Sequence, residues 1–165
     1  MIDDFLKTLG YKALDSRLKR ISDRMSHDIR KLYKEIEIDI EPHWYLVFML
    51  LENQHSVSIA YIAEKLGYAH PSAVMIVKKM SDKEYLTTTG DQSDRRRQMV
   101  SLSAKARSSM PLLKKIWDSC EAAILQTMEA DLGIFIYLDK IDASIKRTPF
   151  YDRFKEEYLK NVNAI

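Results

Sequence analysis

The polar stretch 90–97, which reads GDQSDRRR, ends in one aspartate and three arginines: Asp94, Arg95, Arg96 and Arg97. Guanidinium groups bind phosphates through paired hydrogen bonds, and on a projecting loop they can enter the narrow, electronegative minor groove of DNA. A carboxylate such as that of Asp94 can hold one guanidinium in a fixed orientation. An isolated charge run is more often a solvated loop with local ion pairs, so the neighbouring elements decide between the two interpretations.

The segment 71–84 is a second candidate surface, because it is predicted to be the second helix of a helix–turn–helix. Ser58 is a suitable N-cap for a first helix, Gly67 can end that helix with a positive φ, and Pro71 favours the start of the next one. Apolar residues at helical spacing face inward: Ala73, Ile76, Val77 and Met80. The opposite side is expected to face the major groove, and near it lie His70, Ser72, Met75, Lys78 and Lys79. Any helical hairpin could show this pattern, so the turn alone does not establish DNA binding.

The residues after this helix change from helical to strand character. The runs 85–89 and 98–102 are rich in β-prone residues and enclose the arginine stretch, which predicts a β-hairpin. A helix–turn–helix followed at once by a hairpin is a winged helix. In that setting the arginines lie at the tip of the wing, which favours the minor-groove interpretation over a solvated loop.

Amphipathic helices are predicted on both sides of this core. An apolar stripe runs through 13–36 at Leu14, Leu18, Ile21, Met25, Ile29, Leu32 and Ile36, and Pro42 can begin a second, largely apolar helix. A long helix begins near Ser103, where Pro111 is expected to kink or divide it, and further helices are expected over 134–146 and 149–160. These apolar faces exceed what one small domain can cover, which suggests a second copy of the chain.

The expected fold is therefore mainly α: a winged helix–turn–helix core with a two-stranded hairpin wing, flanked by long dimerisation helices. The expected domains are an N-terminal dimerisation region (1–40), a DNA-binding domain (41–103) and C-terminal dimerisation helices (104–165).

An excess of basic residues, as expected for a nucleic-acid partner, is found in one segment of the chain only. The 165-residue chain has a net charge of +2, but residues 58–107 contain nine Lys and Arg against five Asp and Glu. A single cysteine excludes an internal disulfide framework and a cysteine zinc cluster, and the longest apolar run, 44–51, is too short to span a bilayer. No signal peptide is visible, so a cytoplasmic location is expected. No nucleophile–base pair, phosphate loop or carboxylate pair suggests an enzyme or a cofactor site.

The stretch LGYAHPSAVMIVKKMSDKEYLTTTGDQSDRRRQMVSLSAKA, residues 66–106, resembles the winged-helix core of MarR-type transcriptional regulators. The matching positions are the aspartate–arginine–arginine wing tip and the leucine–threonine-like exit from the wing: Asp94, Arg95, Arg96, Leu102 and Ser103. The order of elements outside this core also matches. The resemblance implies a homodimer with two winged domains that acts as a repressor and responds to a small molecule or another signal.

Several residues depart from the pattern of that family. Glu84 stands where glycine is frequent, Thr88 where arginine is frequent, and Ala106 replaces a frequent glycine. Val74 and Met75 occupy recognition-helix positions that are commonly polar or basic. They cannot make bidentate contacts to bases, so we expect affinity to depend mainly on phosphates and the wing, although both can still meet a thymine methyl group.

Each candidate residue has an expected role at the DNA. Arg96 is expected in the minor groove, oriented by Asp94, while Arg95 and Arg97 meet phosphates. The second group lies on or beside the recognition helix: His70, Ser72 and Met75 face the major groove, and Lys78 and Lys79 neutralise phosphates. The alternative is a winged-helix adaptor that docks proteins without sequence-specific DNA binding.

Aromatic side chains and the single cysteine could each form a further functional site or simply pack in the core. Four aromatic residues could line a pocket for a small aromatic ligand, although aromatic residues at helical spacing more often form core: Tyr33, Trp44, Phe48 and Trp117. Cys120 lies on the inward side of the long helix and is expected to be a structural thiol rather than a redox sensor. The scattered histidines give no metal-ligand spacing.

Overall fold

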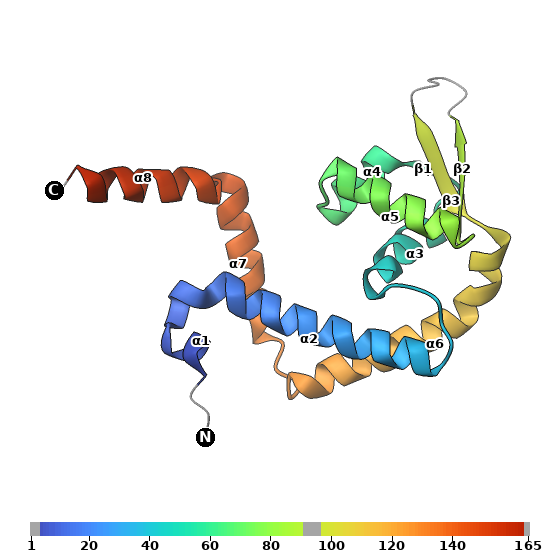
Figure 1. The fold of residues 1–165 in the computed structure, drawn as a ribbon, viewed down its shortest axis with the longest axis horizontal. Helices are drawn as coiled ribbons and strands as arrows, with labels where there is room; N and C mark the ends of the chain where they lie inside the picture. The colour runs from blue at the N-terminus through green and yellow to red at the C-terminus, as the bar shows by residue number, and fades with distance from the viewer. Residues whose placement is uncertain (1–3, 91–96, 164–165) are drawn as a thin grey trace. The chain divides into compact units, whose positions relative to one another are not determined.

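The computed structural model describes residues 4–90 and 97–163 (Figure 1). The chain divides into two compact units, Met1–Trp117 and Asp118–Ile165. The first unit contains α1 (Phe5–Thr8), η1 (Gly10–Ala13), α2 (Leu14–Glu35), η2 (Pro42–Trp44), α3 (Tyr45–Glu52), β1 (Val57–Ser58), α4 (Ile59–Leu66), α5 (His70–Asp82), β2 (Leu86–Gly90) and β3 (Gln98–Leu102). The helix α6 (Ala104–Thr127) begins in the first unit and ends in the second, which also holds α7 (Gly133–Arg147) and α8 (Phe150–Val162). The predicted mainly helical fold with a winged helix–turn–helix core is confirmed.

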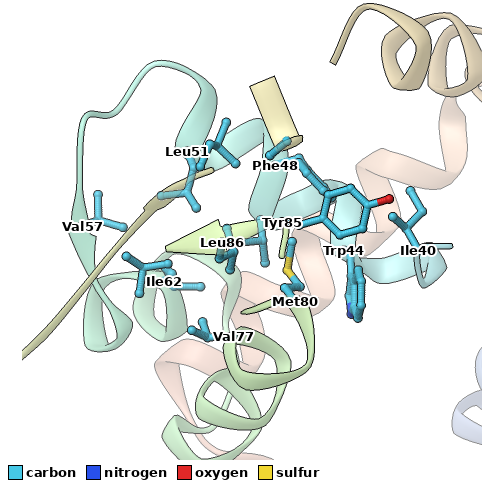
Figure 2. Close-up of a cluster of buried hydrophobic side chains, with 14 of the residues drawn as sticks. Ile40, Trp44, Phe48, Leu51, Val57, Ile62, Val77, Met80, Tyr85 and Leu86 are labelled. Atoms are coloured by element: carbon cyan, nitrogen blue, oxygen red, sulfur yellow. The ribbon is translucent and has the colours of Figure 1, made fainter. Parts of the chain in front are cut away.

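The core of the first unit forms where α3, α4, α5 and the sheet meet. Phe48 and Leu51 of α3, Ile62 of α4 and Met80 of α5 are fully shielded from solvent (Figure 2). The ring of Tyr85 lies edge-on to that of Phe48, with centroids 5.5 Å apart. Close packing of this kind fixes the angle between the helices, and therefore the direction of the solvent face of α5.

The sheet has three antiparallel strands in the order β1-β3-β2, one more than the sequence predicts. Leu86 pairs with Leu102 and Gly90 with Gln98, so β2 and β3 form the predicted hairpin, which extends past α4 and α5 in Figure 1. The unexpected strand β1 is only two residues long, and Val57 pairs with Val100 of β3. A strand this short has no alternation from which it could be predicted.

Pro111 does not divide the long helix, contrary to one of the two outcomes expected from the sequence. The helix α6 runs from Ala104 to Thr127 with Pro111 inside it. A proline in a helix removes one backbone hydrogen bond, here to the carbonyl of Arg107, and the bonds of the flanking turns can hold the helix together. Because Pro111 is exposed, its ring does not displace the core.

Many of the predicted apolar faces outside the winged helix remain uncovered in the single chain. The only residue that α2 buries is Tyr33, while Leu14, Ile21 and Leu32 of the predicted stripe are about half exposed. The helices α7 and α8 bury no side chain among their described residues. Within 4–90 and 97–163, no helix is both long and apolar enough to cross a membrane.

Candidate nucleic-acid interface

The turn between α4 and α5 is built from the residues that predicted it. Ser58 adopts an extended conformation, and its hydroxyl accepts a hydrogen bond from the backbone N–H of Tyr61 at 3.1 Å. At the other end of α4, Gly67 has φ +66°, and the N–H of Tyr68 donates to the carbonyl of Ala63 at 2.9 Å. This is the Schellman ending of a helix, and it reverses the chain so that α5 can pack on α4.

The helix α5 has one buried and one exposed side. Ala73, Val77 and Met80 are buried, as predicted, while Ile76 is half-buried. The predicted DNA-facing residues lie on the accessible side, where Ser72 is half-buried and the rest are exposed: His70, Met75, Lys78 and Lys79. The structure thus brings these five residues onto one helix surface, together with the exposed side chain of Val74.

Two lysines of α5 are available for an anionic partner. Among the described residues, no carboxylate lies within ion-pair distance of Lys78 or Lys79. Lys83, just beyond the helix, differs because it pairs with Asp39 at 2.5 Å, and this contact raises its pKa. Phosphates would therefore meet two uncompensated ammonium groups on α5 itself.

His43 is a titratable neighbour of α5 that sequence analysis did not identify. Burial lowers the pKa of His43; the charge of Glu41 opposes this shift, whereas Lys79 and Arg30 reinforce it. Arg30 is itself paired with Glu41, Nε to Oε2, at 3.1 Å. The proximity of His43 to Lys79 follows from packing between distant parts of the sequence, so no local motif signals it.

The junction between α5 and β2 is tied to the start of α6. The hydroxyl of Ser103 donates to the carbonyl of Glu84 at 2.6 Å, and the Ser103 N–H donates to the carbonyl of Tyr85 at 3.1 Å. The ammonium of Lys105 donates to the carbonyl of Lys83 at 2.8 Å and lies 4.4 Å from the centre of the Tyr85 ring. These contacts tie the end of α5 and the start of β2 to the start of α6.

Arg97 is the one candidate DNA-contacting residue of the predicted wing tip whose position is described. It is exposed and directly precedes β3. The other three predicted residues, Asp94, Arg95 and Arg96, lie outside the described residues. The strand β2 that leads toward the tip exposes Thr87, Thr88 and Thr89.

The four aromatic residues considered as a ligand pocket lie close together inside the first unit. Tyr33, Trp44 and Phe48 are buried, and Trp117 is partly buried. The indole N–H of Trp117 donates to the Tyr33 hydroxyl at 3.2 Å, and the ring centroids of Phe48 and Trp117 are 5.7 Å apart. The arrangement is that of packed core side chains, and binding of an aromatic ligand there stays a prediction.

Cys120 is half-buried on α6, and burial raises the pKa of its thiol, which favours the less reactive protonated form. Within the described part of the chain, no three His, Cys, Asp or Glu side chains are grouped so that they could hold a metal ion.

Comparison with known proteins agrees with this geometry. Residues 38–97, from just before η2 to the residue before β3, match the MarR family. These residues, 38–97, are the MarR-family domain of the chain. This domain includes the whole helix–turn–helix, together with all the predicted DNA-facing residues. No curated protein sequence matches the chain.

Solved structures share the fold over most of the chain. A structure of reduced AbfR bound to DNA has a TM-score of 0.68 at 14% identity and covers 89% of this chain and 98% of its own. The transcriptional repressor CouR, bound to a 23-mer DNA duplex, has a TM-score of 0.64 at 22% identity, with coverages of 88% and 97%. A MarR/EmrR family regulator from Acinetobacter sp. ADP1 has a TM-score of 0.68 at 17% identity, with coverages of 83% and 97%. The similarity thus extends beyond the MarR-family domain to the flanking helices.

Proposed function

We propose that this chain is a homodimeric, DNA-binding transcriptional regulator. The observation that carries the proposal is the accessible face of α5, where Lys78 and Lys79 have no carboxylate partner among the described residues and lie on the second helix of a helix–turn–helix. In such a motif the second helix enters the major groove. Two proteins of similar fold, AbfR and CouR, were solved with DNA bound, which supports the same use of the fold here.

The proposed roles within the interface follow the chain. The segment 71–84 lies in the major groove, with His70, Ser72 and Met75 toward the bases and the two lysines on phosphates. The wing, 90–98, reaches the minor groove through Arg96, which Asp94 orients, while Arg95 and Arg97 contact phosphates. An arginine in the minor groove is attracted most strongly where the groove is narrow and its electrostatic potential most negative.

A second copy of the chain is proposed to cover the apolar surface of the helices outside the MarR-family domain. In the second unit, an apolar hollow is bordered by Leu125, Met128, Leu132 and Phe135. Aromatic side chains that are more than half exposed also lie along α8: Phe150, Tyr151, Phe154 and Tyr158. Apolar surface on this scale is unusual for a monomer and typical of an interface. Two copies would place two recognition helices about 34 Å apart on a pseudo-palindromic operator.

We further propose that the regulator is a repressor and that a small aromatic ligand releases it from DNA. The aromatic cluster around Trp117 joins α2, α3 and α6, so a ligand inserted there would change how the long helices meet the MarR-family domain. A ligand shifts such an equilibrium only if it binds one arrangement more tightly than the other.

Fluorescence-anisotropy titration tests the proposal. The purified protein is titrated with the DNA upstream of its own gene and with an unrelated duplex, at two salt concentrations. We expect tighter binding to the upstream DNA and a steep loss of affinity with rising salt. Replacing Lys78 or Lys79 with Ala should reduce the salt slope by about one per lost phosphate contact, and Arg96→Ala should weaken binding to the upstream DNA and reduce the preference for it.

The matched control is Lys19→Ala on α2, which removes an exposed lysine outside the proposed interface. It should leave the salt slope unchanged. Equal, weak binding to both duplexes that is indifferent to Arg96 would contradict both autoregulation and the role of the wing. Absence of salt-dependent DNA binding would favour the adaptor function, for which the exposed apolar side chains of α5 are the supporting observation.

A further inference from the structure

The solvent face of α5 is apolar at its centre. Val74 is 40% exposed and Met75 is 55% exposed. The accessible face of a surface helix is ordinarily polar. These two neighbouring side chains therefore form an apolar patch on the surface that the proposed function directs at DNA.

Charged and polar residues border this patch along the helix axis. Lys78 and Lys79 follow Val74 and Met75 by four residues, which places them one turn further along the same surface. His70 and Pro71 lie one turn earlier. A partner that fits α5 must therefore offer a small apolar group next to negative charge, and this charge pattern matches a base edge flanked by phosphates.

The remaining residues of α5 narrow the choice of base. The helix contains no Asn or Gln to read adenine and no Arg to read guanine through paired hydrogen bonds, and its two lysines, which could also contact guanine, are assigned to phosphates by the proposed function. The thymine methyl group is the apolar feature among the edges that unmodified base pairs present in the major groove. It is therefore the group on a base edge against which the apolar side chains of Val74 and Met75 can pack.

We propose that α5 recognises thymine methyl groups through Val74 and Met75, and that this contact supplies the base preference of the recognition helix. The inference rests on the proposed DNA-binding function and adds to it the chemical group that is read. Val74 has one strongly preferred side-chain rotamer in a helix and is the rigid part of the contact, whereas Met75 can adapt its longer side chain to the methyl position.

Replacing thymine with uracil removes this methyl group and leaves the base-pairing hydrogen bonds and the phosphates in place. The tightest duplex is first recovered with this protein from a random library, and its thymines are then replaced by uracil one at a time. At one or two thymines of each half-site, we expect the dissociation constant to rise about fourfold per methyl group, the equivalent of one buried methylene-sized group.

Salt and protein variants show whether the lost affinity belongs to the apolar patch. A methyl contact releases no counterions, so the fold-loss should be equal at two salt concentrations, unlike the effect of Lys78→Ala. In the double variant Val74→Ala/Met75→Ala, thymine and uracil duplexes should bind equally. Alanine at these exposed positions favours the helix, so the variant should fold. The matched control, Met49→Ala on α3, removes an equally exposed methionine outside α5 and should retain the full discrimination.

The outcomes separate this inference from the function on which it rests. Uracil substitution without effect at every position, or an equal effect in the double variant, overturns the methyl contact and leaves DNA binding intact. A selected duplex whose half-sites lack thymine, or salt-dependent binding without any selected sequence, also overturns it. Failure to bind any duplex overturns the proposed function itself, and the inference falls with it.

Discussion

At the scale of single residues, Glu84 shows how a sequence can depart from a conformational preference without losing the fold. It lies between α5 and β2 with φ +62°, a left-handed conformation that glycine adopts without a steric penalty. Two hydrogen bonds hold it there: its N–H donates to the carbonyl of Ser81 at 2.8 Å, and its carbonyl accepts from the Ser103 hydroxyl. The surrounding contacts therefore impose a conformation that the glutamate side chain disfavours.

We expect Glu84→Gly to raise the free energy of unfolding by about 1 kcal/mol, because the steric cost of the left-handed conformation is removed. Chemical denaturation of the purified protein measures the change. Glu64→Gly provides the matched control: Glu64 is exposed inside α4, where glycine should lower stability by about 1 kcal/mol. A destabilising effect at both positions would contradict the strain assigned to Glu84.

His43, whose pKa is lowered in the folded state, makes stability dependent on pH. Because burial lowers the pKa of His43 in the folded state, the unfolded chain binds more protons between that lowered pKa and about 6.5. The free energy of unfolding should therefore fall as the pH drops below about 6.5, and the contribution of His43 is fully present above this pH. Urea unfolding at a series of pH values tests this, and His43→Gln should flatten the profile. An unchanged profile in the variant would contradict the assignment.

At the scale of elements, residues with a local role were the ones that sequence predicted well. Ser58, Gly67 and Pro71 act on the backbone within a few positions, and they lie at the ends of α4 and α5 as expected. The short strand β1 depends instead on pairing with β3, about forty residues further along the chain. Local patterns do not contain that information.

The candidate site also has features that follow from local sequence and features that require the folded chain. The exposed face of α5 follows from helical periodicity, so its residues were predicted correctly as a surface. The ties from Ser103 and Lys105 to the carbonyls of residues 83–85, and the position of His43 beside Lys79, require the folded arrangement. The roles of Asp94, Arg95 and Arg96 remain predictions from the sequence.

The side-chain cap of α4 should stabilise the helix–turn–helix. Ser58→Ala removes the acceptor of the Tyr61 N–H and should lower the free energy of unfolding by about 1 kcal/mol. The neighbouring Ser56 is exposed and precedes β1, so Ser56→Ala is the matched control and should have little effect. Both are measured by chemical denaturation. Equal losses in the two variants would show that the cap does not stabilise the turn.

At the scale of the whole molecule, the distribution of burial distinguishes the MarR-family domain from the helices outside it. The domain has a core of fully buried side chains, whereas α7 and α8 bury none among their described residues. Such helices lack the packing that stabilises most helices in proteins. Their stability should therefore depend on association, and so on protein concentration.

The aromatic face of α8 allows association to be tested without altering the MarR-family domain. Phe150, Phe154 and Tyr158 recur every four residues along one side, and the first two rings are stacked 6.3 Å apart in solvent. Phe154→Asp introduces a charge at the centre of this face. We expect sedimentation equilibrium to give twice the chain mass for the natural protein and a shift toward the monomer for the variant, because an unpaired carboxylate is costly to bury.

Glu156→Lys, which changes a charge on the polar side of the same helix, should remain dimeric. A monomeric natural protein at micromolar concentration would contradict the proposed homodimer, since the exposed aromatic face would then have no second copy to cover it.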